Sequence, residues 1–256
     1  KIKNTKTIIN NSSSFEIKVK NDLELFKKAI KNKPNKNNIY DTYSFFLMKN
    51  DGFKNKEFIY SIWKRLTDDI KLGIESNLLN LYIHFPYCQS SCDYCVYPST
   101  ILTNKNQIED YINFLITQIE FFSPLFKGLK FKTLSIGGGT PSLMSKEQLK
   151  KLIEKIHEKF NYDKYGEKSI EFNPNTTTSG KIKIIEKYGF NKLSIGVQSL
   201  SPDVLKNINR EYQTIDKIRN TVNEVKKSDM GFLNIDLLLG LFSDTSEKFL
   251  KSFEEI

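Results

Sequence analysis

Three cysteines carry the most specific chemistry in the sequence. All the thiols of the chain, Cys88, Cys92 and Cys95, lie within the stretch "YIHFPYCQSSCDYC". Thiolates spaced Cys-x3-Cys-x2-Cys can bind three irons of a 4Fe–4S cluster, which leaves one iron open to a small molecule. Zinc is the alternative, because His84 precedes Cys88 by four residues and could complete a Cys3His site.

Alternating strand and helix patterns from about residue 79 onward must position these thiols. The predicted strands are 79–85, 131–137, 168–173, 192–198 and 232–240, and the predicted helices are 106–122, 146–160, 179–188, 202–209, 215–227 and 246–256. Repeated strand–helix units predict an α/β fold with a parallel sheet, either a barrel or an open doubly wound sheet. In both folds the carboxyl ends of the strands meet on one side, where we expect a single active site.

Local signals support these element boundaries. Ser145 and Gln148 form a capping box before the helix at 146–160. Ser201 followed by Pro202 predicts a helix start, and Gly189 is typical of the residue after a helix end.

Unusual residues follow the predicted strands. The glycine triplet Gly137–Gly139 comes after the second strand and would let the backbone approach a ligand closely. It lacks the dinucleotide-binding pattern G-x-G-x-x-G. Glu171 lies on the face of its strand opposite Ile170 and Phe172, and a carboxylate that points into a barrel is costly unless it is paired or functional. Asp236 lies within an apolar strand.

Composition limits the classes of function. The net charge of +9 comes mostly from lysine, with only Arg65, Arg210 and Arg219 as arginines, and no basic stripe interleaved with aromatic residues predicts a nucleic-acid surface. No membrane span or signal peptide is predicted. Three clustered cysteines argue against a disulfide scaffold and favour a reducing compartment, so we expect a cytoplasmic protein.

Residues 1–76 are predicted to form a helical or irregular extension, and residues 77–256 the barrel domain. The extension contains a polar tail at 1–20, helical patterns at 21–32 and 56–74, and a linker at 31–38. The last predicted helix has no terminating Gly or Pro.

The cysteine stretch resembles that of the radical S-adenosylmethionine (SAM) enzymes. Within them it resembles the branch of the oxygen-independent coproporphyrinogen III oxidase HemN and the heme chaperone HemW. The stretches "SIGGGTPSLMS", "IEFNPNTT", "NKLSIGVQSL", "NREYQ" and "NIDLLLGL" follow in the order of that branch and cover residues 79–242.

The resemblance implies a partial (β/α)6 radical SAM barrel of which five strands lie within the chain. It places the sixth strand beyond residue 256, so we expect the chain to belong to a longer protein. It also implies a 4Fe–4S cluster, one or two SAM molecules, a tetrapyrrole or other small-molecule substrate, and an electron donor such as flavodoxin or ferredoxin. Reductive cleavage of SAM would yield a 5′-deoxyadenosyl radical.

The resemblance also assigns residues to these cofactors. Cys88, Cys92 and Cys95 would bind the cluster, and Tyr82 would lie beside it. The residues assigned to SAM, including a second molecule, are Gly138, Gly139, Thr140, Glu171, Gln198, Arg210 and Asp236. Tyr82 and Glu171 are the candidate catalytic residues.

Three departures leave the substrate open. Tyr97 stands where many HemN-type oxidases carry another cysteine, which favours the HemW side. The long segment before the motif is more like HemN, and Phe242 stands where a proline is usual. The alternatives are therefore an oxidase, a heme chaperone or a methyltransferase of the same branch.

Overall fold

The computed structural model describes residues 56–256. The predicted tail at 1–20, the helical pattern at 21–32 and the linker at 31–38 lie outside the described residues. The helical pattern predicted at 56–74 forms α3 (Lys56–Lys71). Residues 63–256 group into one unit, which contains all the strands of the described part.

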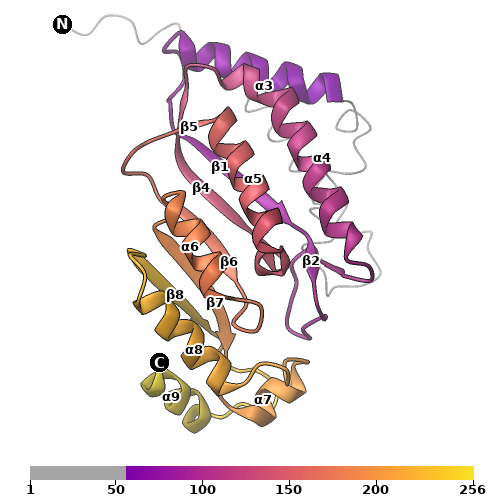
Figure 1. The fold of residues 1–256 in the computed structure, drawn as a ribbon, viewed down its shortest axis with the longest axis vertical. Coiled ribbons are helices and arrows are strands. Elements are labelled where there is room, and N and C mark those ends of the chain that lie inside the picture. The colour runs from indigo at the N-terminus through magenta and orange to yellow at the C-terminus, as the bar shows by residue number, and fades with distance from the viewer. Residues whose placement is uncertain (1–55) are drawn as a thin grey trace, which may run out of the picture. The chain divides into compact units, whose positions relative to one another are not determined.

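A parallel sheet forms the centre of this unit (Figure 1). Its main path runs β1 (Leu79–Phe85), β4 (Lys130–Gly138), β6 (Lys168–Phe172), β7 (Lys192–Gln198) and β8 (Phe232–Leu237). Neighbouring strands on this path are parallel and follow one another along the chain. A doubly wound sheet reverses its strand order at a switch point, and this path does not, so the predicted partial barrel is confirmed.

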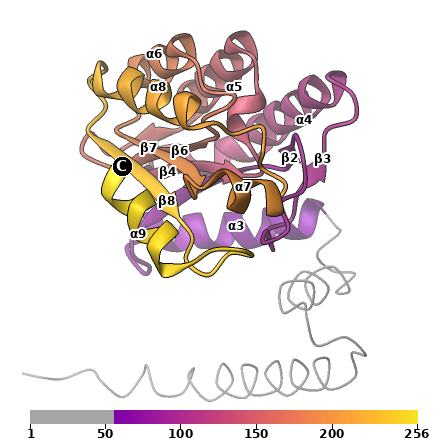
Figure 2. The same cartoon turned by 90° about the horizontal axis from the view of Figure 1, so that it is seen from below.

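Helices form one layer against a single face of the sheet (Figure 2). They are α4 (Asn106–Phe122), α5 (Lys146–Lys159), α6 (Ser179–Lys187) and α8 (Ile215–Lys226). Every second residue of the strands points into this layer, including the buried Ile136, Ile170, Phe172, Leu193 and Ile195. The helices contribute an apolar stripe with isoleucine and leucine at helical spacing.

Shorter elements complete the unit. They are β2 (Tyr87–Cys88), β3 (Thr100–Ile101), η2 (Ser123–Phe126), η3 (Pro141–Leu143), β5 (Asn161–Tyr162), α7 (Pro202–Asn207) and α9 (Ser246–Glu255). The parallel pair β2–β3 closes the two ends of the cysteine loop. Sequence periodicity misses β2, β3 and β5 because two residues are too few to show a pattern.

Three predicted elements are shorter than expected, and the first is the helix predicted at 56–74, since α3 ends at Lys71. The helix predicted at 202–209 ends at Asn207, and Asn209 has a φ of 59°, which a helix cannot accommodate. The strand predicted at 232–240 ends at Leu237, and Gly240 has a φ of 80° in the turn that follows. The other predicted strands and helices of the barrel agree with the structure to within a residue at each end.

Two of the three predicted helix-end signals form as expected, and the third does not. The capping box of Ser145 and Gln148 is confirmed, and Gly189 adopts the left-handed φ of 72° expected after a helix end. Ser201 lies at the N-cap of α7 as predicted, but its hydroxyl donates to Asp203 instead of capping a backbone N–H. Within residues 56–256, no helix combines the length and apolar character that crossing a membrane requires.

Candidate active site

A cavity of about 510 Å³ lies at the carboxyl ends of the strands. It brings together all the residues that the family resemblance assigns to the cluster and SAM, whereas His84 and Gly137 do not line it. Those that line it are Tyr82, Cys88, Cys92, Cys95, Gly138, Gly139, Thr140, Glu171, Gln198, Arg210 and Asp236. These residues span the sheet from β1 to β8, so the ends of its strands border one cavity.

The three cysteine thiols are free and lie on one side of this cavity. The Cys95 amide donates to the Cys92 carbonyl at 3.0 Å, which forms a turn between the last two thiols. The Thr140 hydroxyl donates to the Cys88 sulfur at 3.6 Å, and the Nε of Arg210 donates to the Cys92 sulfur at 3.2 Å. Such donors stabilise negative charge on sulfur, while burial raises the pKa of the Cys88 thiol.

His84 uses both of its ring nitrogens within the protein. Its Nε2 lies 3.1 Å from the Pro98 carbonyl oxygen, and its Nδ1 lies 3.1 Å from the Tyr82 hydroxyl. A carbonyl can only accept, so Nε2 carries the proton and Nδ1 accepts from Tyr82. Within residues 56–256, no three Cys, His, Asp or Glu side chains are grouped so that they could hold a single metal ion. This arrangement does not support the zinc alternative with His84 as fourth ligand.

The glycines that end β4 are required by packing. A Cβ added to Gly138 would lie 2.5 Å from the His84 ring, and one added to Gly139 would lie 2.5 Å from the Tyr87 carbonyl oxygen. Gly138 also has a φ of 113°, which disfavours any other residue. Both residues line the cavity, but His84 and Phe85 of β1 already exclude a side chain at Gly138, and the Pro86–Tyr87 backbone excludes one at Gly139.

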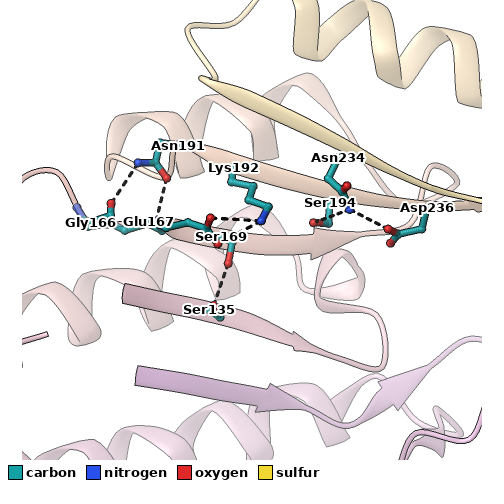
Figure 3. A network of polar contacts seen from close by, with 10 residues as sticks. Ser135, Gly166, Glu167, Ser169, Asn191, Lys192, Ser194, Asn234 and Asp236 are labelled. Atoms are coloured by element: carbon teal, nitrogen blue, oxygen red, sulfur yellow. Dashed lines mark hydrogen bonds and ion pairs between the residues drawn. The ribbon is translucent and has the colours of Figure 1, made fainter. Parts of the chain in front are cut away.

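Two carboxylates face the open side of the sheet. Glu171 accepts from the Gly138 amide at 3.2 Å, and Asp236 accepts from the Asn234 side chain at 2.8 Å (Figure 3). Burial raises the pKa of Glu171, the negative charge of Asp236 raises it further, and the Gly138 hydrogen bond opposes both effects. The Glu171 side chain is exposed at the cavity, so its carboxylate is accessible to a cationic or hydrogen-bonding ligand.

The rest of this face carries hydroxyls and amides. Ser135 and Ser169 are hydrogen-bonded at 2.9 Å across β4 and β6, and Asn234 reaches Ser194 at 3.4 Å across β7 and β8 (Figure 3). Tyr82 belongs to the same face and is 55% exposed, which excludes a role in core packing. The face opposite the helices is therefore polar along the strands that lead to the cavity.

A bulge ends strand β7. The register with β8 shifts between Gly196 and Gln198, and Gln198 takes a φ of 71°. The guanidinium of Arg210 lies against this bulge, because its Nη1 donates to the Gly196 carbonyl at 2.7 Å. The bulge thus brings Gln198 and Arg210 to the same wall of the cavity as Cys92.

Sequence analysis gave no role to two residues beside this wall. The Tyr94 ring lies 5.7 Å from the Arg210 guanidinium, and Gln213 is buried and hydrogen-bonded to Arg210. Both belong to stretches that the motif comparison singled out, "CDYC" and "NREYQ". Their sequence positions alone do not distinguish them from other polar residues, and only their contacts in the folded protein do.

Fold and site together define a class: an α/β barrel domain whose cavity is bordered by a three-cysteine loop. The model of the radical SAM superfamily matches residues 82–256. The chain belongs to the radical SAM superfamily.

Its relatives include both members of the branch that the motifs resemble. The chain is 37% identical over 165 residues to the heme chaperone HemW of Buchnera aphidicola, covering 64% of this chain and 43% of that protein. It is 31% identical over 178 residues to the oxygen-independent coproporphyrinogen III oxidase of Escherichia coli, covering 70% of this chain and 39% of that protein. The chain thus spans about two fifths of the length of these curated relatives.

A solved structure agrees with this relationship. Coproporphyrinogen III oxidase (HemN) of Escherichia coli, described as a radical SAM enzyme, aligns with a TM-score of 0.69 at 28% identity. The alignment covers 78% of this chain and 44% of that one. Membership of the superfamily implies a 4Fe–4S cluster and SAM.

Proposed function

We propose that the barrel domain binds a 4Fe–4S cluster through Cys88, Cys92 and Cys95 and cleaves SAM reductively in the adjoining cavity. The observation that carries the proposal is the sharing of one cavity by three free thiols and the polar ends of five strands. A loop of three thiolates leaves one iron of such a cluster without a protein ligand, and that iron is where SAM would bind.

The residues present fit the cluster. The cysteine loop is held at both ends by the β2–β3 pair, and hydroxyl and guanidinium donors point at two of the sulfurs. Hydrogen bonds to the sulfurs are among the factors that stabilise and tune iron–sulfur clusters. His84 is not available for the fourth position, since both of its ring nitrogens are hydrogen-bonded elsewhere.

The same cavity offers groups for SAM. Glu171 and Asp236 suit its hydroxyl and amino groups. The Nη2 of Arg210, which has no acceptor among the described residues, suits a carboxylate. When bound, the cluster supplies one electron that cleaves SAM to methionine and a 5′-deoxyadenosyl radical. The protein binds and orients SAM, and it limits the access of water to the reacting atoms.

For the substrate, a tetrapyrrole is the best-supported class, because the relatives are named as coproporphyrinogen III oxidases and heme chaperones. We favour an oxidase-like oxidoreductase that receives its electron from a flavodoxin- or ferredoxin-like donor. A heme chaperone is the second candidate, favoured by Tyr97, which lines the cavity and is 63% exposed where the oxidases carry a cysteine. A methyltransferase of the same branch is the third.

Product analysis separates these candidates. Anaerobically reconstituted protein is supplied with SAM, dithionite and coproporphyrinogen III, and decarboxylated products and 5′-deoxyadenosine are quantified. A parallel titration with heme measures binding without turnover. Decarboxylation supports the oxidase, whereas tight heme binding without any decarboxylated product supports the chaperone.

A further inference from the structure

The bulge at the end of β7 offers two backbone carbonyls to side chains. The Gly196 carbonyl accepts from Nη1 of Arg210 at 2.7 Å, and the Val197 carbonyl accepts from Nε2 of Gln213 at 2.5 Å. A Cβ at Gly196 would lie 2.8 Å from Nε2 of the Gln198 side chain, which would have to move, while its distance of 3.6 Å from Nη1 of Arg210 is an ordinary contact. The bulge therefore acts as an anchor for both side chains.

The contacts of Gln213 fix which way its amide points. Gln213 is 2% exposed, and only its NH2 group can bond to the Val197 carbonyl. Its own oxygen must then face Arg210, where it accepts from Nη1 at 3.2 Å. Gln213 is not among the residues that line the cavity, so it touches the site only through Arg210.

Arg210 in turn points one N–H at a cysteine of the cluster loop. With Nη1 held by Gly196 and Gln213, its Nε lies 3.2 Å from the Cys92 sulfur. Among the described residues, Arg210 has no carboxylate partner. A part-buried guanidinium is stabilised by hydrogen-bond acceptors, and the sulfur of Cys92 is the acceptor that its Nε reaches.

We propose that Gln213 is a positioning residue that holds Arg210 so that its Nε–H bonds to the sulfur of Cys92 and raises the reduction potential of the cluster. The proposal rests on the proposed function, since it presumes the cluster. Positive charge and hydrogen bonds at a cluster sulfur favour the reduced state, which carries one more electron. That electron comes from the external donor, and no bond to Arg210 or Gln213 is made or broken.

The test measures the midpoint potential of the reconstituted cluster by a titration with dithionite followed by electron paramagnetic resonance. Gln213→Met keeps the length of the side chain and removes both hydrogen bonds. Its reduced-to-oxidised ratio at a fixed potential should fall about tenfold, which is a shift of about 59 mV for one electron. Thr221→Val is the matched control, because Thr221 is also buried, hydrogen-bonds the Pro174 carbonyl and lies away from the cysteines. The control should keep the wild-type potential.

A second variant keeps the proposal testable if Gln213→Met does not fold. Gln213→Glu places a carboxylate beside Arg210 and should lower the potential by partly neutralising the guanidinium. A folded, cluster-loaded variant of either kind with the wild-type potential would overturn the proposal, as would loss of folding in both, which would assign Gln213 to the core alone. If the wild-type protein takes up no cluster, the proposed function fails instead.

Discussion

The two faces of the same sheet differ in what their residues do. On the helix-covered face, Ile170 and Phe172 are buried in the core, while between them Glu171 points to the open cavity. A strand alternates its side chains, so one short sequence supplies both stability and chemistry. Substitutions at adjacent positions of a strand should therefore have different effects, one on stability and the other on the site.

The largest effect is expected at the cysteine loop. Cys92→Ala removes one cluster ligand and should reduce 5′-deoxyadenosine formation to background, because a cluster with two cysteine ligands is not retained. The measurement is iron and sulfide content together with product formation after anaerobic reconstitution. Ser90→Ala, in the same loop, is the control for cluster loading, since the Ser90 hydroxyl has no hydrogen-bond partner among residues 56–256. A Cys92→Ala protein with full activity would contradict the assignment.

A substitution on the helix-covered face should lower the free energy of unfolding and leave cluster loading unchanged. Ile170→Ala opens a cavity beneath the helices and should cost about 2–5 kcal/mol of the free energy of unfolding. Urea denaturation of the cluster-free variant and wild type gives this difference. Ile170 is not among the residues that line the cavity, so cluster loading of the folded variant should match wild type. A cost below about 1 kcal/mol would show that the sheet is not packed as described.

Glu171 should show the opposite behaviour to its neighbour Ile170. Glu171→Gln keeps the shape but removes the charge, and it should weaken SAM binding about tenfold, or about 1.4 kcal/mol. Equilibrium dialysis of the cluster-loaded protein measures the affinity. Gly138→Val is a poor probe of the same site, because its side chain would collide with His84 and the Phe85 backbone before it met any ligand. Unchanged affinity in Glu171→Gln would remove this carboxylate from the SAM site.

The ionisation of Glu171 should also make the stability of the protein depend on pH. Because burial raises the pKa of Glu171, the fold favours its protonated form, and stability is lost as pH rises from the ordinary value of 4.5 through the raised one. Glu171→Gln removes this loss, so the stability of the variant relative to wild type should increase as pH rises through that window. Thermal unfolding of both cluster-free proteins from pH 4 to pH 8 tests the sign. A difference that shrinks with rising pH would contradict the raised pKa of Glu171.

The smallest effect is expected in the helix layer. Ser145→Ala removes the cap that accepts from the Gln148 amide and should cost about 1 kcal/mol. Urea denaturation should resolve this loss, and SAM binding should be unaffected. Ser201→Ala is the matched control, because Ser201 occupies an N-cap without making the capping bond. Equal losses in the two variants would show that the capping hydrogen bond is not the cause.

Period-two and helical patterns predict most of the barrel because each of its main elements has one buried face. The ends of α7 and β8 escaped prediction, since Asn209 and Gly240 adopt left-handed backbone that no periodicity signals. The candidate site was predictable as a set of strand ends. The need for glycine at Gly138 and Gly139 was attributed to a ligand, but contacts with β1 and β2 already account for it.

Residues that act through another side chain are the hardest to predict. Gln213 is separated from Cys92 by more than a hundred positions along the chain. Its link to the cysteine runs through Arg210 and the bulge of β7, which exist only in the folded protein. Spacing along the sequence carries no information about such contacts.

The most direct test of the central claim is the electron paramagnetic resonance spectrum of the reduced, anaerobically reconstituted protein with and without SAM, alongside iron, sulfide and zinc analysis. The account predicts about four irons and four sulfides per chain and a signal that changes on addition of SAM, because one iron is open to it. Stoichiometric zinc without labile sulfide, or a cluster signal that does not change when SAM is added, would contradict the claim.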